Sequence, residues 1–262
     1  MRKTGKSLLV AAVLAFIASL SMHGLAVISA TPPAIETDSD LIAPLAAQVP
    51  IDMVDTLLVP RSIGSLSLLL VLGCALVYHA LRRWDADAEP AHDYHAIFSR
   101  HPAKGSLTQH APLATGLLAG ALWPWLELSR PLTALVLAGV MAAGLIVAAG
   151  AGVHQEGRLR KSAALCFAAG WATLAASAML ASVLQHGLGA PPLLAACLGL
   201  SVAAALTFSV QLRLGRMISY SAAVIWGLIA IAAGAMLGNV GMATLAVLAI
   251  AAIAFALVQV ST

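Results

Sequence analysis

Ionisable side chains inside apolar segments are the first candidates for chemistry in this chain, because a charge in lipid is costly and tends to mark a functional site. Glu127 and Arg130 stand near the end of the apolar stretch 111–128. Side chains three residues apart share one face of a helix. The pair has two interpretations: a carboxylate that lines a ligand cavity, or an ion pair at the outer membrane surface.

Histidines offer a second kind of chemistry. His23 and His79 lie in apolar segments. They could be axial haem ligands, or histidines satisfied by hydrogen bonds between helices. A zinc site needs three or four ligands in a fixed geometry, so we expect a solvated loop and no metal centre in the polar segment 84–110. Four histidines lie there: His92, His95, His101 and His110.

The tryptophans form a more specific pattern. Trp123 and Trp125 flank Pro124, which removes a backbone donor and predicts a kink. Trp171 and Met179 share a helix face with small neighbours. Large rings beside small residues can form the wall of a pocket for a planar apolar ligand, although the same pattern also serves helix packing. The candidate ligand-binding residues are Trp123, Trp125, Trp171, Met179, Glu127 and Arg130.

Catalytic motifs are absent from the sequence. We find no GxSxG, Walker loop, HExxH or GxGxxG. Isolated serines such as Ser177 and Ser209 are expected to bond to backbone carbonyls of their own helices. We therefore expect no enzyme and no catalytic residues.

The elements that must position these residues are membrane-spanning helices. Of 262 residues, 61% are hydrophobic and 10% charged, against about 25% charged in soluble proteins. A spanning helix needs about 20 mostly apolar residues. We predict an all-α, polytopic integral membrane bundle of about eight transmembrane helices. The predicted spans are 8–30, 62–83, 111–128, 131–153, 162–185, 190–212, 218–238 and 241–260.

Basic residues predict how these spans are threaded. Of the 14 Lys and Arg, twelve fall in alternate gaps between spans, and only Arg61 and Arg130 fall in the others. Lys and Arg collect on the cytoplasmic side. The pattern predicts a bacterial inner membrane protein with both termini in the cytoplasm.

The predicted organisation has four parts. Residues 1–30 form the first transmembrane helix, or a signal peptide whose removal would leave seven spans. Residues 31–61 form an acidic extracytoplasmic loop that lies on the membrane or caps the bundle. Residues 62–185 hold core helices two to five, with the cytoplasmic loop 84–110. Residues 186–262 add three helices, the last of which resembles scaffold more than site.

Small residues predict where helices approach closely. Gly116 and Gly120 are four apart in the third span, and Gly144, Ala148 and Gly152 continue the same spacing in the fourth. Such stripes let helix backbones pack tightly in lipid.

The segments Ala121-Leu122-Trp123-Pro124-Trp125-Leu126-Glu127-Leu128-Ser129-Arg130-Pro131 and Gly170-Trp171-Ala172-Thr173-Leu174-Ala175 resemble the tryptophan-rich sensory protein family. This is the bacterial branch related to the mitochondrial translocator protein. Residues 8–185 supply the five spans usual in the family, and the last three helices would be additions. The loop 31–61 lacks the family's tryptophans, and Met179 stands where the family usually has Asn. The resemblance implies a pocket within the bundle for porphyrin-like or sterol-like ligands, so porphyrin or haem is the cofactor to test.

These observations predict a membrane protein that binds a planar apolar ligand within its bundle, with a sensory or transport-linked role. The alternatives are a small secondary transporter, for which the Pro-interrupted segment 111–128 would mark the site, and a structural or assembly subunit of a larger membrane complex. The expected partners are membrane lipids and a small apolar ligand, in a homo-oligomer or larger complex. Nothing in the sequence suggests binding to nucleic acid.

Overall fold

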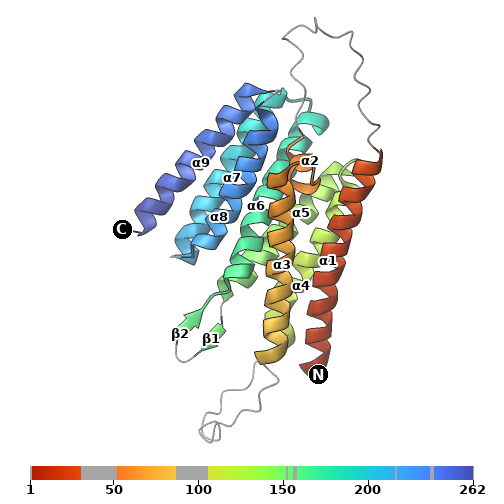
Figure 1. Cartoon of the computed structure of the whole chain (residues 1–262), viewed down its shortest axis with the longest axis vertical. Coiled ribbons are helices and arrows are strands. Elements are labelled where there is room, and N and C mark those ends of the chain that lie inside the picture. The colour runs from red at the N-terminus through yellow and green to blue at the C-terminus, as the bar shows by residue number, and fades with distance from the viewer. Residues whose placement is uncertain are drawn as a thin grey trace, which may run out of the picture.

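The computed structural model of the chain describes residues 2–30, 52–86, 106–151, 153–155, 158–215, 217–236 and 239–261. Over these ranges the chain forms a bundle of long helices that run up and down in alternation (Figure 1). Among the described residues, seven helices are long and apolar enough to cross a membrane, and the apolar part of α4, Ala111–Leu126, is shorter. The chain is a multi-pass membrane protein with an all-α bundle, as the sequence predicts.

The helices follow the predicted spans closely. Most boundaries differ from the predicted ones by only a few residues, and α6 continues into a π-helical turn at Val183–Gly187. The elements are α1 (Arg2–Ala30), α2 (Met53–Leu58), α3 (Ile63–Ala86), α4 (Ser106–Leu126), α5 (Pro131–Ala151), β1 (Val153–Gln155), β2 (Arg158–Arg160), α6 (Ala163–Ser182), α7 (Pro192–Leu214), α8 (Ile218–Ala235) and α9 (Val240–Ser261).

Local signals in the sequence set several of these ends. Ser162 caps α6 by accepting a hydrogen bond from Leu165 N, and Asn239 caps α9 by accepting one from Met242 N. Gly215 ends α7 with φ of 67°, a left-handed conformation that favours glycine. Between α5 and α6 the two short strands pair antiparallel, with Val153 opposite Arg160.

Helix α6 lies at the centre of the bundle. It packs against α5, α7, α8 and α3, and also against the short helix α2. The close approach predicted from the glycines is found between Gly116 of α4 and Gly144 of α5, where a Cβ on Gly144 would meet Pro112 O at 2.5 Å and the Gly116 Cα at 3.0 Å. Gly152 lies outside the described residues. Small residues thus bring these two backbones together where a larger side chain would not fit.

The two ends of the bundle differ in charge. We call the end with α2 and the α4–α5 turn the α2 end, and the end with β1, β2 and the start of α1 the hairpin end (Figure 1). Arg82, Lys161 and Arg213 lie at the hairpin end, and Arg61 and Arg130 at the α2 end. The segments between spans that carry most of the Lys and Arg residues therefore lie together at the hairpin end.

Candidate functional site

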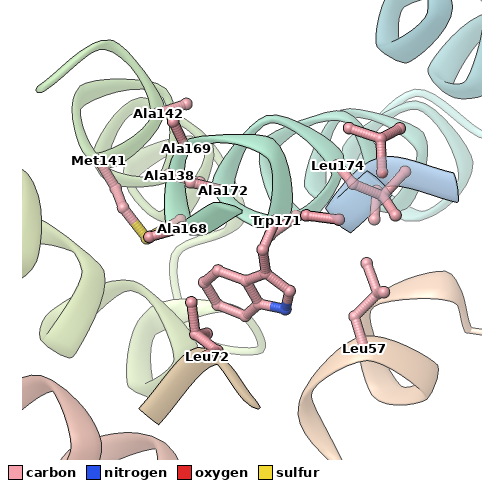
Figure 2. Close-up of a cluster of buried hydrophobic side chains, with 14 of the residues drawn as sticks. Leu57, Leu72, Ala138, Met141, Ala142, Ala168, Ala169, Trp171, Ala172 and Leu174 are labelled. Atoms are coloured by element: carbon pink, nitrogen blue, oxygen red, sulfur yellow. The ribbon is translucent and has the colours of Figure 1, made fainter. Parts of the chain in front are cut away.

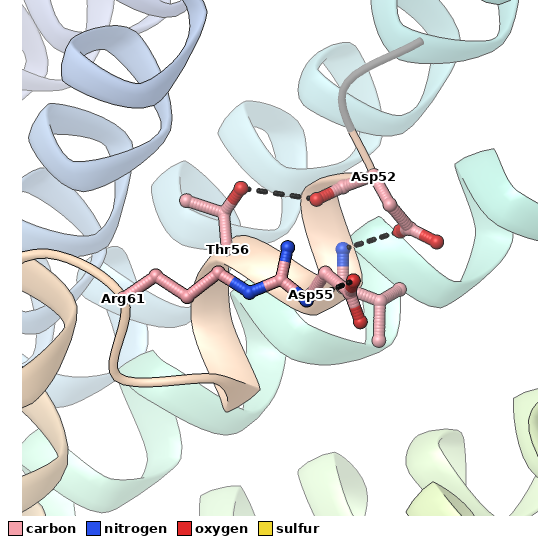
Figure 3. Close-up of polar contacts among 5 residues, drawn as sticks. Asp52, Asp55, Thr56 and Arg61 are labelled. Carbon is pink, nitrogen blue, oxygen red and sulfur yellow. Dashed lines mark hydrogen bonds and ion pairs between the residues drawn. The ribbon is translucent and has the colours of Figure 1, made fainter. Parts of the chain in front are cut away.

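A short buried helix closes the α2 end. Asp52 caps α2 by accepting a hydrogen bond from Val54 N (2.9 Å), and the Thr56 hydroxyl donates to the Asp52 carbonyl oxygen (3.0 Å; Figure 3). Val54 and Leu57 are fully buried, and α2 contacts α1, α3, α6 and α8. Of the two placements predicted for the loop 31–61, its described part adopts the cap, inserted between the spans.

Trp171 stands in the middle of the bundle. It is fully buried on α6, and the ring of Phe16 on α1 meets it edge to face, with 5.9 Å between centroids and 81° between planes. Figure 2 shows the indole reaching toward Leu72 of α3, with Leu57 of α2 on its other side. Its Nε1–H has no hydrogen-bond acceptor. The predicted pocket wall is therefore a packed interior position that carries one unsatisfied donor.

The two tryptophans beside Pro124 face different surroundings, because residues two apart on a helix point in nearly opposite directions. Trp123 is fully buried, and its Nε1–H has no acceptor. Trp125 is 48% exposed, and its Nε1 donates to the Ser19 hydroxyl at 2.8 Å. The edge of His23 also meets its ring. Trp123 thus belongs to the interior with Trp171, and Trp125 to the seam between α1 and α4.

Met179 lies two helical turns beyond Trp171 on α6. Its side chain is fully buried, and its carbonyl oxygen accepts a hydrogen bond from Val183 N where α6 passes into the π-helical turn. Eight residues of α-helix span about 12 Å, so Met179 and Trp171 occupy different levels of the bundle. Met179 is therefore nearer than Trp171 to the C-terminal end of α6.

Glu127 lies in the turn between α4 and α5 and is only 8% exposed. Arg130 is exposed and forms no ion pair with it, so the interpretation of an ion pair at the membrane surface does not hold in this structure. Burial raises the pKa of Glu127 to about 8, and the negative charges of Asp52 and Asp55 add to the shift. Its carboxyl group is therefore protonated at neutral pH.

Asp55 takes part in the same electrostatic group. Its pKa is raised, first by burial and then by Asp52, while Arg61 and His23 act in the opposite direction. Arg61 Nη2 lies 3.8 Å from Asp55 Oδ2 (Figure 3), and both side chains are more than a third exposed. Asp52, Asp55 and Glu127 thus influence one another electrostatically, and we call these three carboxyl groups the acidic cap.

The sequence gives no direct sign that Asp52 and Asp55 meet Glu127, because α2 is too short to show a hydrophobic period. A signal does exist at one residue: Asp52 precedes a mostly apolar segment, 53–59, that stops before Pro60, which is the pattern of a capped short helix. This pattern predicts α2 but not its insertion among α1, α3, α6 and α8.

The structure separates the two histidines considered as haem ligands. His79 lies near the hairpin end, where its Nδ1 is 3.0 Å from the Ser162 hydroxyl, and His23 lies near Asp55 at the α2 end. They cannot bind one haem iron, and His79 is satisfied by a hydrogen bond between helices. In the predicted loop 84–110, His92, His95 and His101 lie outside the described residues, and the structure describes only the backbone of His110, so the metal site is not tested there. Within the described ranges, no group of three His, Cys, Asp or Glu could hold a metal ion.

A small cavity of mixed polar and apolar lining adjoins Asp52 of the acidic cap. It has a volume of about 20 Å³ and is lined by Asp52, Gln185, His186 and Asn239, among others. That volume suits about one water molecule with several polar partners. The π-helical turn of α6 contributes to this cavity, and such turns occur often at functional sites.

Comparison of the chain with protein-family models, with curated proteins and with solved structures finds no match.

Proposed function

We propose that this multi-pass membrane protein binds a planar apolar ligand, porphyrin-like or sterol-like, within its helix bundle beside Trp123 and Trp171. The ligand carries at least one hydrogen-bond acceptor. The role is sensory or linked to transport and requires no covalent chemistry. In this proposal the basic hairpin end faces the cytoplasm, and the α2 end faces outward in a bacterial inner membrane.

One observation carries the proposal: two indole N–H groups are buried without an acceptor, at Trp123 and Trp171. Buried polar atoms are nearly always paired, and tryptophan usually finds a partner when it is buried. Leaving a donor unpaired costs about 1–3 kcal/mol. A ligand oxygen or ring nitrogen that accepts from these indoles would remove that cost.

The α2 cap suggests how such a ligand would enter. Leu57 of α2 belongs to the buried cluster around Trp171 that Figure 2 draws, and α2 is only six residues long. Moving one short helix breaks fewer contacts than moving a whole span. The likeness of the segments around Trp123 and Trp171 to the tryptophan-rich sensory protein family supports the same reading of these residues.

The test is titration of the detergent-solubilised full chain with protoporphyrin IX, followed by the porphyrin's own fluorescence. Trp171→Phe keeps an aromatic ring but removes the donor, so it should weaken binding about tenfold, the value of one buried hydrogen bond. Trp226→Phe is the matched control, since Trp226 is a half-buried tryptophan that packs on Phe167 of α6. Unchanged affinity in both Trp123→Phe and Trp171→Phe would reject the proposal.

A second candidate, a small secondary transporter, is favoured by a different observation. Glu127 is buried with a pKa of about 8, near Asp52 and Asp55, so it could bind and release a proton in the neutral range. Proteoliposomes with an imposed pH gradient test this: Glu127→Gln should abolish proton-coupled uptake of a solute, while Arg130→Gln should retain it. A chain that moves no solute from a broad panel would exclude the transporter.

A further inference from the structure

A lipid-facing groove opens between α7, α8 and α9, away from the tryptophans and the acidic cap. Its volume is about 550 Å³, within the range of small-molecule sites. Phe208 and Leu212 of α7 and Phe255 and Leu257 of α9 line its apolar walls. In Figure 1, α7, α8 and α9 lie together on one side of the molecule, and the C-terminal part of α9 diverges from the other two helices.

The polar floor of the groove is satisfied from within the protein. The Ser221 hydroxyl donates to Gln211 Oε1 at 2.8 Å, and Gln211 Nε2 donates to the carbonyl oxygens of Gly215 (2.6 Å) and Met217 (3.3 Å). Thr207 donates to the carbonyl oxygen of Ala203. Because these groups already have partners, the deep part of the groove favours an apolar occupant such as an acyl chain.

The hairpin end of the groove is positively charged. Arg213 follows the lining residue Leu212 and is exposed. Lys161 Nζ donates to the carbonyl oxygens of Arg213 (3.2 Å) and Leu214 (3.0 Å), so it lies at the C-terminal end of α7, the helix that supplies Leu212 to the groove. The acidic side chains that the structure describes, Asp52, Asp55 and Glu127, all lie at the opposite end of the bundle.

We propose that this groove binds an anionic phospholipid, with its acyl chains along the apolar walls and its phosphate at Arg213 and Lys161. Basic side chains at the membrane surface attract anionic headgroups, and guanidinium groups pair well with phosphate. The charge at the mouth and the apolar interior below it match the two parts of one lipid molecule. The site is separate from the proposed ligand pocket and does not depend on it.

Quenching by lipids with brominated acyl chains tests the proposal on the full chain in vesicles. A Phe208→Trp reporter places an indole in the groove, and Val136→Trp places one on the lipid-facing side of α5. Vesicles contain brominated phosphatidylglycerol or brominated phosphatidylcholine with identical chains. The signal of the parent protein is subtracted. Brominated phosphatidylglycerol should then quench the Phe208→Trp reporter severalfold better than brominated phosphatidylcholine does, and the two lipids should quench the Val136→Trp reporter equally.

Second substitutions in the Phe208→Trp background identify the cause. Arg213→Gln should reduce the preference for phosphatidylglycerol about fivefold, the value of one basic residue near a membrane surface. Arg82→Gln removes a charge at the same end of the bundle and should leave the preference intact. Ala204→Phe fills the groove and should lower quenching by both lipids.

Three results would overturn the proposal. Equal quenching by the two lipids at the Phe208→Trp reporter means that no anionic site exists there. A preference that survives Arg213→Gln, or that falls equally in Arg82→Gln, assigns the effect to general surface charge. Quenching that is unchanged by Ala204→Phe means that the acyl chains lie outside the groove.

Discussion

Helices α6 and α9 differ in a way that a hydropathy scale does not anticipate. The most apolar stretch of α6 has a mean hydropathy of 1.7 and is 72% buried, whereas that of α9 has a mean hydropathy of 2.5 and is 29% buried. In water the more apolar helix would be the interior one. In lipid the surroundings are as apolar as leucine, so burial follows close packing and hydrogen bonding instead.

The interior helix, α6, has a glycine and a hydroxyl group that make close contacts with a neighbouring helix. On α6, a Cβ at Gly170 would overlap the carbonyl oxygen of Tyr220, and the Thr173 and Tyr220 hydroxyls lie 2.9 Å apart. Helix α9 has mostly Ala, Leu, Ile and Val, with large side chains such as Leu248 and Phe255 exposed. Substitutions in α6 should therefore change the free energy of unfolding more than matched substitutions in α9.

Truncation of a leucine gives the largest expected contrast. Leu174 on α6 is fully buried against α8, where a Cβ on Gly227 would overlap it, and Leu248 on α9 is 60% exposed. Leu174→Ala should lower the free energy of unfolding by about 2–3 kcal/mol through lost contacts and a residual cavity. Leu248→Ala should change it by under about 0.5 kcal/mol. Unfolding in mixed micelles, followed by circular dichroism, measures both, and equal effects would remove the distinction.

Glycine substitution probes close approach between backbones. Gly170→Ala should destabilise the bundle by about 2 kcal/mol, because its new Cβ meets backbone atoms of α8 that have little room to move. Gly139 on α5 has no heavy atom within 4 Å of a Cβ built there. Gly139→Ala should therefore be neutral, or stabilising by up to about 1 kcal/mol through helix propensity. The same unfolding assay compares the two, and a neutral Gly170→Ala would show that α6 and α8 can move apart easily.

Stability should depend on pH through the acidic cap and not through α9, which has no ionisable side chain. The folded pKa of Glu127, about 8, lies above its ordinary value of 4.5, so the folded state binds more protons between these values. The contribution of Glu127 to stability is therefore greatest below about pH 4.5 and falls as the pH rises toward 8, by up to about tenfold in the unfolding equilibrium constant per pH unit.

Glu127→Gln should flatten this profile, and Arg130→Gln should leave its shape unchanged. The measurement is the midpoint of unfolding from pH 5 to pH 9. A profile that is level in the parent protein would mean that Glu127 is ionised throughout and faces solvent. Asp55 contributes in the same direction, because its pKa is also raised.

Loss of one interhelical hydrogen bond gives the smallest effect. Tyr220→Phe removes the contact with Thr173 and should cost about 0.6 kcal/mol, the average for such bonds between membrane helices. Ser209→Ala is the control, since that exposed hydroxyl bonds only within its own helix. Equal small effects from both variants would show that the Thr173–Tyr220 hydrogen bond adds no measurable stability, because the Thr173 hydroxyl keeps its bond to the Ala169 carbonyl oxygen.

Much of the fold could be predicted from the sequence because spans are selected by composition. The predicted boundaries agree with the helices to within a few residues for α7, α8 and α9, and the glycine stripe at Gly116 and Gly144 packs as expected. The hydroxyls of Ser177 and Ser209 donate to carbonyl oxygens four residues earlier, as predicted. Each of these features depends on neighbours close in the chain or on a spacing repeated along one helix.

Less of the candidate site than of the fold could be predicted from the sequence. Trp123 and Trp125 are alike in the sequence, yet one is buried and one is half exposed. Asp52 matters because its charge acts on Glu127, which lies 75 positions later in the chain. Gln211 matters because it lines the groove between α7 and α9. No local pattern encodes these relations, because they depend on which helices become neighbours.

The number of spans, their limits and the grouping of basic residues at one end follow from the composition of the chain, since lipid accepts only long apolar helices whose backbone bonds are internal. The insertion of α2, the exposure of the most apolar helix and the unpaired indoles at the centre arise from packing between distant segments. Lipid solvates every apolar helix face equally well, so shape and hydrogen bonding choose which faces turn inward.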